Sequence, residues 1–153
     1  MASLIGFYSL VFGFCLSLLI TLFSIKNLRN SNIFDKKLIS LTFLQFFFVV
    51  ISFFGLIFSF VNSDFSNETV FNHSHTTIPL FYKVSGTWGN HEGSLLLWLL
   101  VLTLFIFLFL LKTKKQIKNY RILTLIFQEV IIIGFFIFLL KTSNPFNYIF
   151  PIP

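Results

Sequence analysis

The chain has 153 residues, of which 56% are hydrophobic and only 10% are charged, and its mean hydropathy is +0.91. A soluble domain carries about 25% charged residues, so this composition excludes an ordinary cytosolic enzyme, a nucleic-acid module and a disordered tail. The net charge of +6 reflects orientation in a bilayer, because the basic residues occupy short segments between apolar runs. The sequence predicts an all-α integral membrane protein.

Four nearly uncharged runs have the length of membrane-crossing helices. About 20 residues at 1.5 Å per residue cross a hydrocarbon core of roughly 30 Å. Helices are the expected form because lipid cannot hydrogen-bond an open backbone. The first run also lacks the basic start and small-residue cleavage pattern of a signal peptide. We expect a single membrane domain over residues 1–153, with helices at 4–25, 38–61, 94–111 and 122–140 and a loop at 62–93.

The basic residues predict the topology. Nine of the eleven Lys and Arg residues lie in segments 26–37 and 112–121. The positive-inside rule assigns these segments to the cytoplasm or matrix. Segment 62–93 and both termini are then expected on the outer side, in the intermembrane space or periplasm.

Small and polar residues recur along the first two runs and predict helix packing. Such residues let membrane helices approach closely and form hydrogen bonds. In the first run they are Gly6, Gly13, Ser17 and Ser24; in the second they are Gln45, Ser52 and Ser59, with Thr42 and Gly55 beside them.

A carboxylate lies within the fourth run. Glu129 follows Gln128, and insertion of a carboxylate near the bilayer centre costs roughly 2.5–3.5 kcal/mol, so Glu129 should face protein or a polar cavity. Gln45 and Glu129 are each the eighth residue from the basic end of their runs. We therefore expect Gln45 to hydrogen-bond Glu129 or Gln128 and to tie the two helices together. The alternative interpretation is proton handling or contact with a quinone.

The sequence predicts no metal site. His73 and His75 have no third ligand nearby, and two imidazoles in a loop make a weak zinc site. Cys15, the single cysteine, is interpreted as a small packing residue. Glycosylation sequons begin at Asn67 and Asn72 and matter only in a secretory compartment.

The end of segment 62–93 combines aromatic residues, glycines and a helix start. Trp88 suits the membrane interface, and Gly93 allows close backbone approach. Asn90 can cap the third membrane helix, while Glu92 complements the positive end of that helix. His91, Ser94 and Trp98 share one helix face. By spacing alone, an interfacial anchor with a helix cap is favoured over a ligand site.

Two sequence blocks carry a resemblance to a known family. The first is Trp88-Gly89-Asn90-His91-Glu92-Gly93-Ser94, which follows Pro79-Leu80-Phe81-Tyr82-Lys83. The second is Thr142-Ser143-Asn144-Pro145-Phe146, with Pro151-Ile152-Pro153 after it. With the helix spacing, these blocks resemble the amino-terminal quarter of the CcmF family of cytochrome c haem lyases, including its organellar forms.

The resemblance implies a role in cytochrome c maturation. CcmF-type proteins work with partners that include a haem carrier, and they attach haem to the CxxCH thiols of apocytochrome c through thioether bonds. Haem is therefore the expected cofactor of the assembled complex. The expected partners are the remaining haem lyase polypeptides, the haem carrier, apocytochrome c and the lipid bilayer, without nucleic acid.

The chain departs from the family pattern in one respect. It has only two tryptophans and no tryptophan-rich segment, and no histidine lies in a predicted membrane helix. The resemblance thus implies one piece of a split lyase, which is not catalytic alone and does not ligate haem. The expected surface for partners or haem delivery consists of Trp88, Gly89, Asn90, His91, Glu92, Gly93 and Ser94.

A rival interpretation is a structural subunit of a larger inner-membrane, respiratory complex without catalytic duty. A channel or transporter is a third and less favoured interpretation. Such proteins are expected to have paired charges within the membrane, and Glu129 is the one charged residue inside the predicted membrane helices. The expected location is the mitochondrial inner membrane, since one Ala and two Arg beside 25 Phe indicate an AT-rich, organellar genome. The bacterial inner membrane is the alternative.

Overall fold

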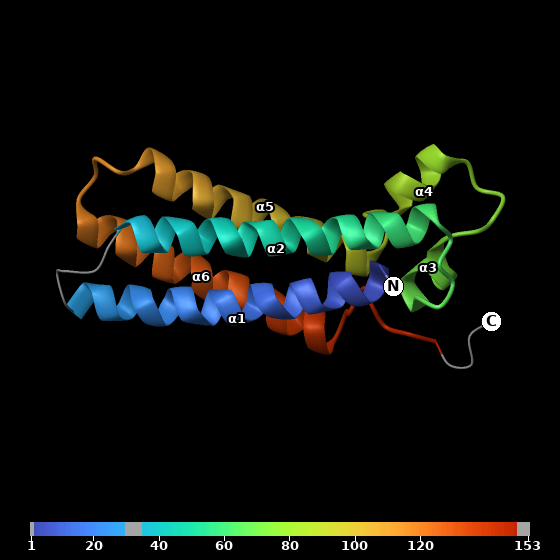
Figure 1. Ribbon diagram of the computed structural model, residues 1–153, viewed down its shortest axis with the longest axis horizontal. Coiled ribbons are helices and arrows are strands. Elements are labelled where there is room, and N and C mark those ends of the chain that lie inside the picture. Colours follow the sequence, from blue (N-terminus) through green and yellow to red (C-terminus); the bar gives the residue numbers. More distant parts are fainter. Residues whose placement is uncertain (1, 30–34, 150–153) are drawn as a thin grey trace.

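The computed structural model describes residues 2–29 and 35–149, and these residues form a bundle of helices (Figure 1). Within these described residues, four long helices are apolar enough to cross a membrane, as predicted. Two short helices lie between the second and third of them. In chain order the helices are α1 (Ala2–Arg29), α2 (Asp35–Val61), α3 (Glu68–His73), α4 (Leu80–Gly86), α5 (His91–Lys112) and α6 (Lys118–Lys141).

The four long helices lie side by side along the molecule (Figure 1). Helix α1 packs against α2 and α6, and α5 packs against the same two helices. The end of α5 and the start of α6 lie at the same end of the bundle as the start of α2, so the described parts of both predicted basic segments lie at that end. The opposite end, here named the cap end, holds the start of α1, the helices α3 and α4, and segment 142–149. Assignment of the cap end to the outer side of the membrane stays a prediction.

Close contact between α1 and α2 depends on the predicted small residues. A Cβ atom added to Gly55 would lie 3.1 Å from Gly6 Cα and 3.2 Å from the carbonyl oxygen of Ala2. The serines of both patterns are fully buried: Ser17, Ser24, Ser52 and Ser59. Helix packing therefore explains these patterns.

The structure differs from the predicted loop at 62–93, because this segment contains α3 and α4. Asn67 begins α3 by accepting hydrogen bonds from the backbone N–H groups of Thr69 and Val70. Helix α5 begins at His91, three residues before the predicted start, because Asn90 caps it. Residues 151–153 of the second family-like block lie outside the described residues.

Candidate functional site

The run from Trp88 to Ser94 forms the corner between α4 and α5 at the cap end. Burial divides this run into two parts. Trp88 is 41% exposed, and Gly89 and His91 are also exposed. Asn90 and Gly93 are buried, while Glu92 and Ser94 are half-buried. The predicted surface thus has two parts, here named the rim and the frame. The rim consists of the exposed and half-buried residues Trp88, Gly89, His91, Glu92 and Ser94, and the frame consists of the buried residues Asn90 and Gly93.

Asn90 and Gly93 make the frame. The Asn90 side chain accepts a hydrogen bond from Gly93 N at 2.6 Å and donates to the carbonyl of Gly86 at 2.9 Å. A Cβ atom on Gly93 would lie 1.6 Å from the carbonyl oxygen of Thr87. Only glycine fits this approach, so the turn after α4 is held directly against the first turn of α5.

His91 joins the two family-like blocks. Its Nδ1 atom is hydrogen-bonded to Ser143 Oγ at 3.2 Å, and its ring lies edge-on to Phe138. Ser143, just after α6, is buried. The two blocks are separated in sequence, yet the fold brings them into one site.

Glu92 and Trp98, which both lie on α5, have different surroundings. Glu92 lies in the first turn of α5, where its charge complements the helix dipole. Its Oε2 atom is buried without a hydrogen-bond partner among the described residues. Trp98, two turns further along α5, is 61% exposed and continues the apolar surface of the helix.

Asn67 is a central residue of the cap end that the sequence analysis missed. Its side chain donates to Ser3 Oγ and to the carbonyl of Pro145, both at 2.9 Å, in addition to capping α3. It is fully buried, so the sequon at this position is part of the fold and not an exposed glycan acceptor. The Asn-Glu-Thr sequence at 67–69 is typical of a helix start, and this pattern could have predicted the capping role of Asn67.

Segment 142–149 lies across the cap end beside Asn67. The backbone of Glu68 donates to the carbonyl of Asn147 at 2.9 Å, and that of Ile149 donates to the carbonyl of Ser66 at 3.1 Å. Phe146 is buried against Gly6. The described part of the second family-like block therefore closes the bundle at this end.

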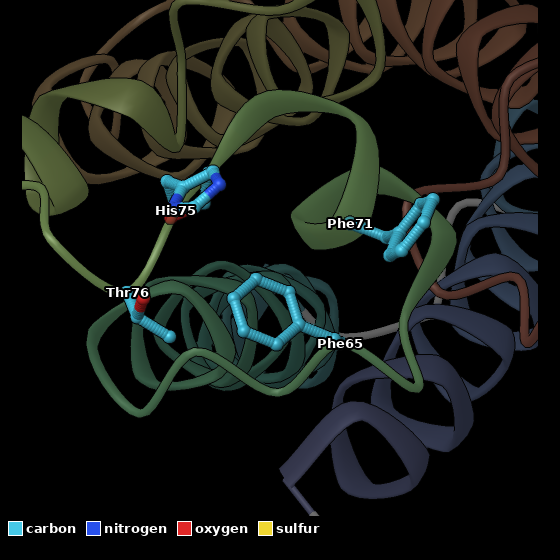
Figure 2. Close-up of a pocket in the computed structure, with 5 residues that line it drawn as sticks. Phe65, Phe71, His75 and Thr76 are labelled. Atoms are coloured by element: carbon cyan, nitrogen blue, oxygen red, sulfur yellow. The ribbon is translucent and has the colours of Figure 1, made fainter. Parts of the chain in front are cut away.

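His73 and His75 do not form a metal-binding cluster with each other and a third ligand. His73 Nδ1 bonds the carbonyl of Thr69 in its own helix. His75 lines a pocket of about 340 Å³ whose other lining residues are Phe65, Phe71, Ser74 and Thr76 (Figure 2). Over residues 2–29 and 35–149, no group of three His, Cys, Asp or Glu side chains is placed to hold a metal ion.

Two polar side chains of the membrane interior meet at Glu129, which is fully buried. Gln45 Nε2 donates to Glu129 Oε2 at 3.1 Å, which confirms the predicted tie between α2 and α6. Ser17 Oγ of α1 donates to the same oxygen at 2.5 Å, a contact that the sequence analysis missed. Gln128 takes no part in this contact, and its Oε1 atom has no hydrogen-bond partner among the described residues.

The fold and the cap-end site define a membrane protein segment of four spanning helices. No family model matches the chain. Two similar bacterial proteins are the cytochrome c-type biogenesis protein CycK of Rhizobium meliloti and CcmF of Haemophilus influenzae. CycK is 36% identical over 97% of this chain, and CcmF is 34% identical over 96% of it. The solved structure of the cytochrome c haem lyase CcmF superposes with a TM-score of 0.86 and 26% identity over 96% of this chain.

These similarities confirm the resemblance to the CcmF family. The chain is homologous in sequence to part of a CcmF protein, and its fold is similar to that part. The chain spans 22–23% of the length of the two named relatives and 25% of the solved chain. The homology therefore covers almost all of this chain but about a quarter of a family member.

Proposed function

We propose that the chain is the amino-terminal part of a cytochrome c haem lyase, acting with further polypeptides in cytochrome c maturation. The observation that carries this proposal is the joint match of sequence and fold over nearly the whole chain. The match covers about a quarter of the solved CcmF chain, so the proposed lyase also includes parts outside the aligned region.

The cap end is the proposed working surface. Trp88, His91 and Glu92 lie on the hydrogen-bonded frame of Asn90 and Gly93, and side chains that are held in place before binding lose less entropy on association. They would contact the haem carrier, apocytochrome c or the partner chain. Haem is here a substrate of the assembled lyase. His91 is not proposed as a haem ligand, because the resemblance to the CcmF family does not support that role.

The proposed orientation places the cap end and both termini on the outer side of the membrane. The basic residues gathered at the opposite end of the bundle support it. The proposed membrane is the mitochondrial inner membrane, supported by the Ala-poor, Phe-rich composition. The bacterial inner membrane is the alternative, supported by the bacterial sources of the named relatives.

The test is substitution in the native membrane, with holocytochrome c measured by haem staining and spectroscopy. We expect Trp88→Ala, His91→Ala and Glu92→Ala each to lower holocytochrome c about tenfold, the effect of losing about 1.4 kcal/mol of binding. Membrane levels of the chain should stay unchanged. Trp98→Ala is the matched control, since Trp98 is exposed on α5 but lies beyond the rim.

A second variant separates binding from folding. Ser143→Ala removes the hydrogen bond to His91 without altering the exposed imidazole. It should retain more holocytochrome c than His91→Ala does. Normal holocytochrome c in all three rim variants would overturn the proposed surface.

A further inference from the structure

Gly134 lies at the centre of the outward face of α6. The buried residues of this helix include Glu129, Ile132 and Phe136. Gly134 is two residues from both Ile132 and Phe136, and each residue of a helix turns by about 100°, so Gly134 points away from the bundle.

The glycines of the other spanning helices differ from Gly134. A Cβ atom on Gly6, Gly13 or Gly55 would come within 2.4–3.1 Å of a neighbouring side chain or backbone atom. A Cβ atom on Gly134 meets nothing within 4 Å among the described residues. Packing inside the described bundle thus accounts for the first three glycines and not for Gly134.

An apolar groove between α5 and α6 contains Gly134. Its volume is about 370 Å³, and it is lined also by Leu95, Ile131, Phe135 and Phe138. Ile131 is 54% exposed and Phe138 is 42% exposed. Because Gly134 has no side chain, it leaves a gap between these larger side chains. In a membrane this face of the bundle is covered by lipid or by another helix.

We propose that this groove receives an apolar transmembrane helix from the part of the haem lyase outside the region aligned with CcmF here. Glycine weakens a helix relative to other residues, and in membranes it is favoured where another helix approaches closely. The contact of Gly55 with Gly6 shows this use within the bundle. About three quarters of the solved CcmF chain lie outside the aligned bundle, so a family member has further chain to place against it.

A second apolar groove provides the comparison. It lies along α1 and α2, with Ile5, Phe54 and Gly55 among its lining residues. Its glycine is already accounted for by the contact with Gly6. The docking site is therefore assigned to the groove at Gly134 and not to this one.

The assignment rests on the proposed function, and the experiment separates the two. A photoreactive benzoylphenylalanine replaces Ile131, Phe138 or, as the control in the second groove, Phe54. The chain is illuminated in its native membrane, isolated in gentle detergent and analysed by mass spectrometry. We expect Ile131 and Phe138 to crosslink to an apolar helix of a copurifying lyase polypeptide, with little or no such product from Phe54.

A bulk substitution gives an independent readout. Gly134→Leu should leave the thermal stability of the purified chain unchanged while reducing copurification of the partner about tenfold. Val50→Trp likewise adds bulk to the second groove and should leave copurification unchanged. If the partner copurifies but the groove yields only lipid adducts, the docking site is wrong and the proposed function stands. If no lyase polypeptide copurifies with the unmodified chain, the proposed function fails as well.

Discussion

Two polar regions hold this bundle together by different means. In the membrane interior, Ser17 and Gln45 both donate to the Glu129 carboxylate, so side chains alone join α1, α2 and α6. At the cap end, Asn67 and Asn90 bond mainly to backbone groups. The interior region links helices whose backbone hydrogen bonds are already made. The cap-end region instead supplies hydrogen bonds to backbone groups in turns and at helix ends.

The difference follows from what each region must satisfy. In lipid the helices satisfy their own backbone, so only side chains remain to connect them. Hydrogen bonds between membrane helices contribute modestly, about 0.6 kcal/mol on average in one measured system. At the cap end, lost caps and orphaned buried carbonyls cost about 1–3 kcal/mol each. Damage to the cap end should therefore cost more than damage to the interior.

Gly93→Ala should have the largest effect. The new Cβ atom would overlap the backbone oxygen of Thr87, which cannot move without displacing the turn after α4. Overpacking typically costs about 1–3 kcal/mol, and we expect about 3 kcal/mol or more here. The measurement is thermal unfolding in detergent. Gly89→Ala is the control, since its Cβ atom would make ordinary contacts at 3.5 Å. Equal stability of the two variants would contradict the close approach.

Asn67→Ala should come next, at about 2–3 kcal/mol. It removes the α3 cap and leaves Ser3 Oγ and the carbonyl of Pro145 without their donor. Limited proteolysis should then cut segment 142–149 sooner than in the unmodified chain. Asn72→Ala changes an exposed asparagine of the same short helix and should have little effect. Unchanged proteolysis in Asn67→Ala would show that Asn67 does not anchor the segment.

Gln45→Leu should have the smallest effect, about 1 kcal/mol in the free energy of unfolding in mixed micelles. Ser17 continues to donate to Glu129 in this variant. Combination with Glu129→Leu in a double-mutant cycle should give a coupling energy of about 0.5–1 kcal/mol. Ser24→Ala is the control, because the buried Ser24 hydroxyl donates to the carbonyl of Ile20 within its own helix. A coupling energy near zero would refute the tie between α2 and α6.

The sequence predicted one of the two interior contacts. Gln45 and Glu129 were paired by depth, because both helices start from the basic end. The same count puts Ser17 ninth from the basic end of its run, at a matching depth. Depth indicates which groups share a layer of the membrane. It does not indicate which helix faces turn toward each other, so Ser17 remained undetected.

At the cap end the sequence predicted local features better than partners. The Asn90 cap depends on residues within one helical turn, and it was predicted correctly. The short helices α3 and α4 were missed, because six- and seven-residue helices carry too little periodicity to stand out.

By itself the sequence determined a membrane protein with four spanning helices, because hydropathy and charge are local properties of the chain. It also contained the motifs that relate this chain to CcmF. Only the tertiary structure decided that His91 meets Ser143, that Asn67 meets Ser3, and that Ser17 meets Glu129. These partners are 52, 64 and 112 residues apart, so their contacts depend on how the helices turn and pack.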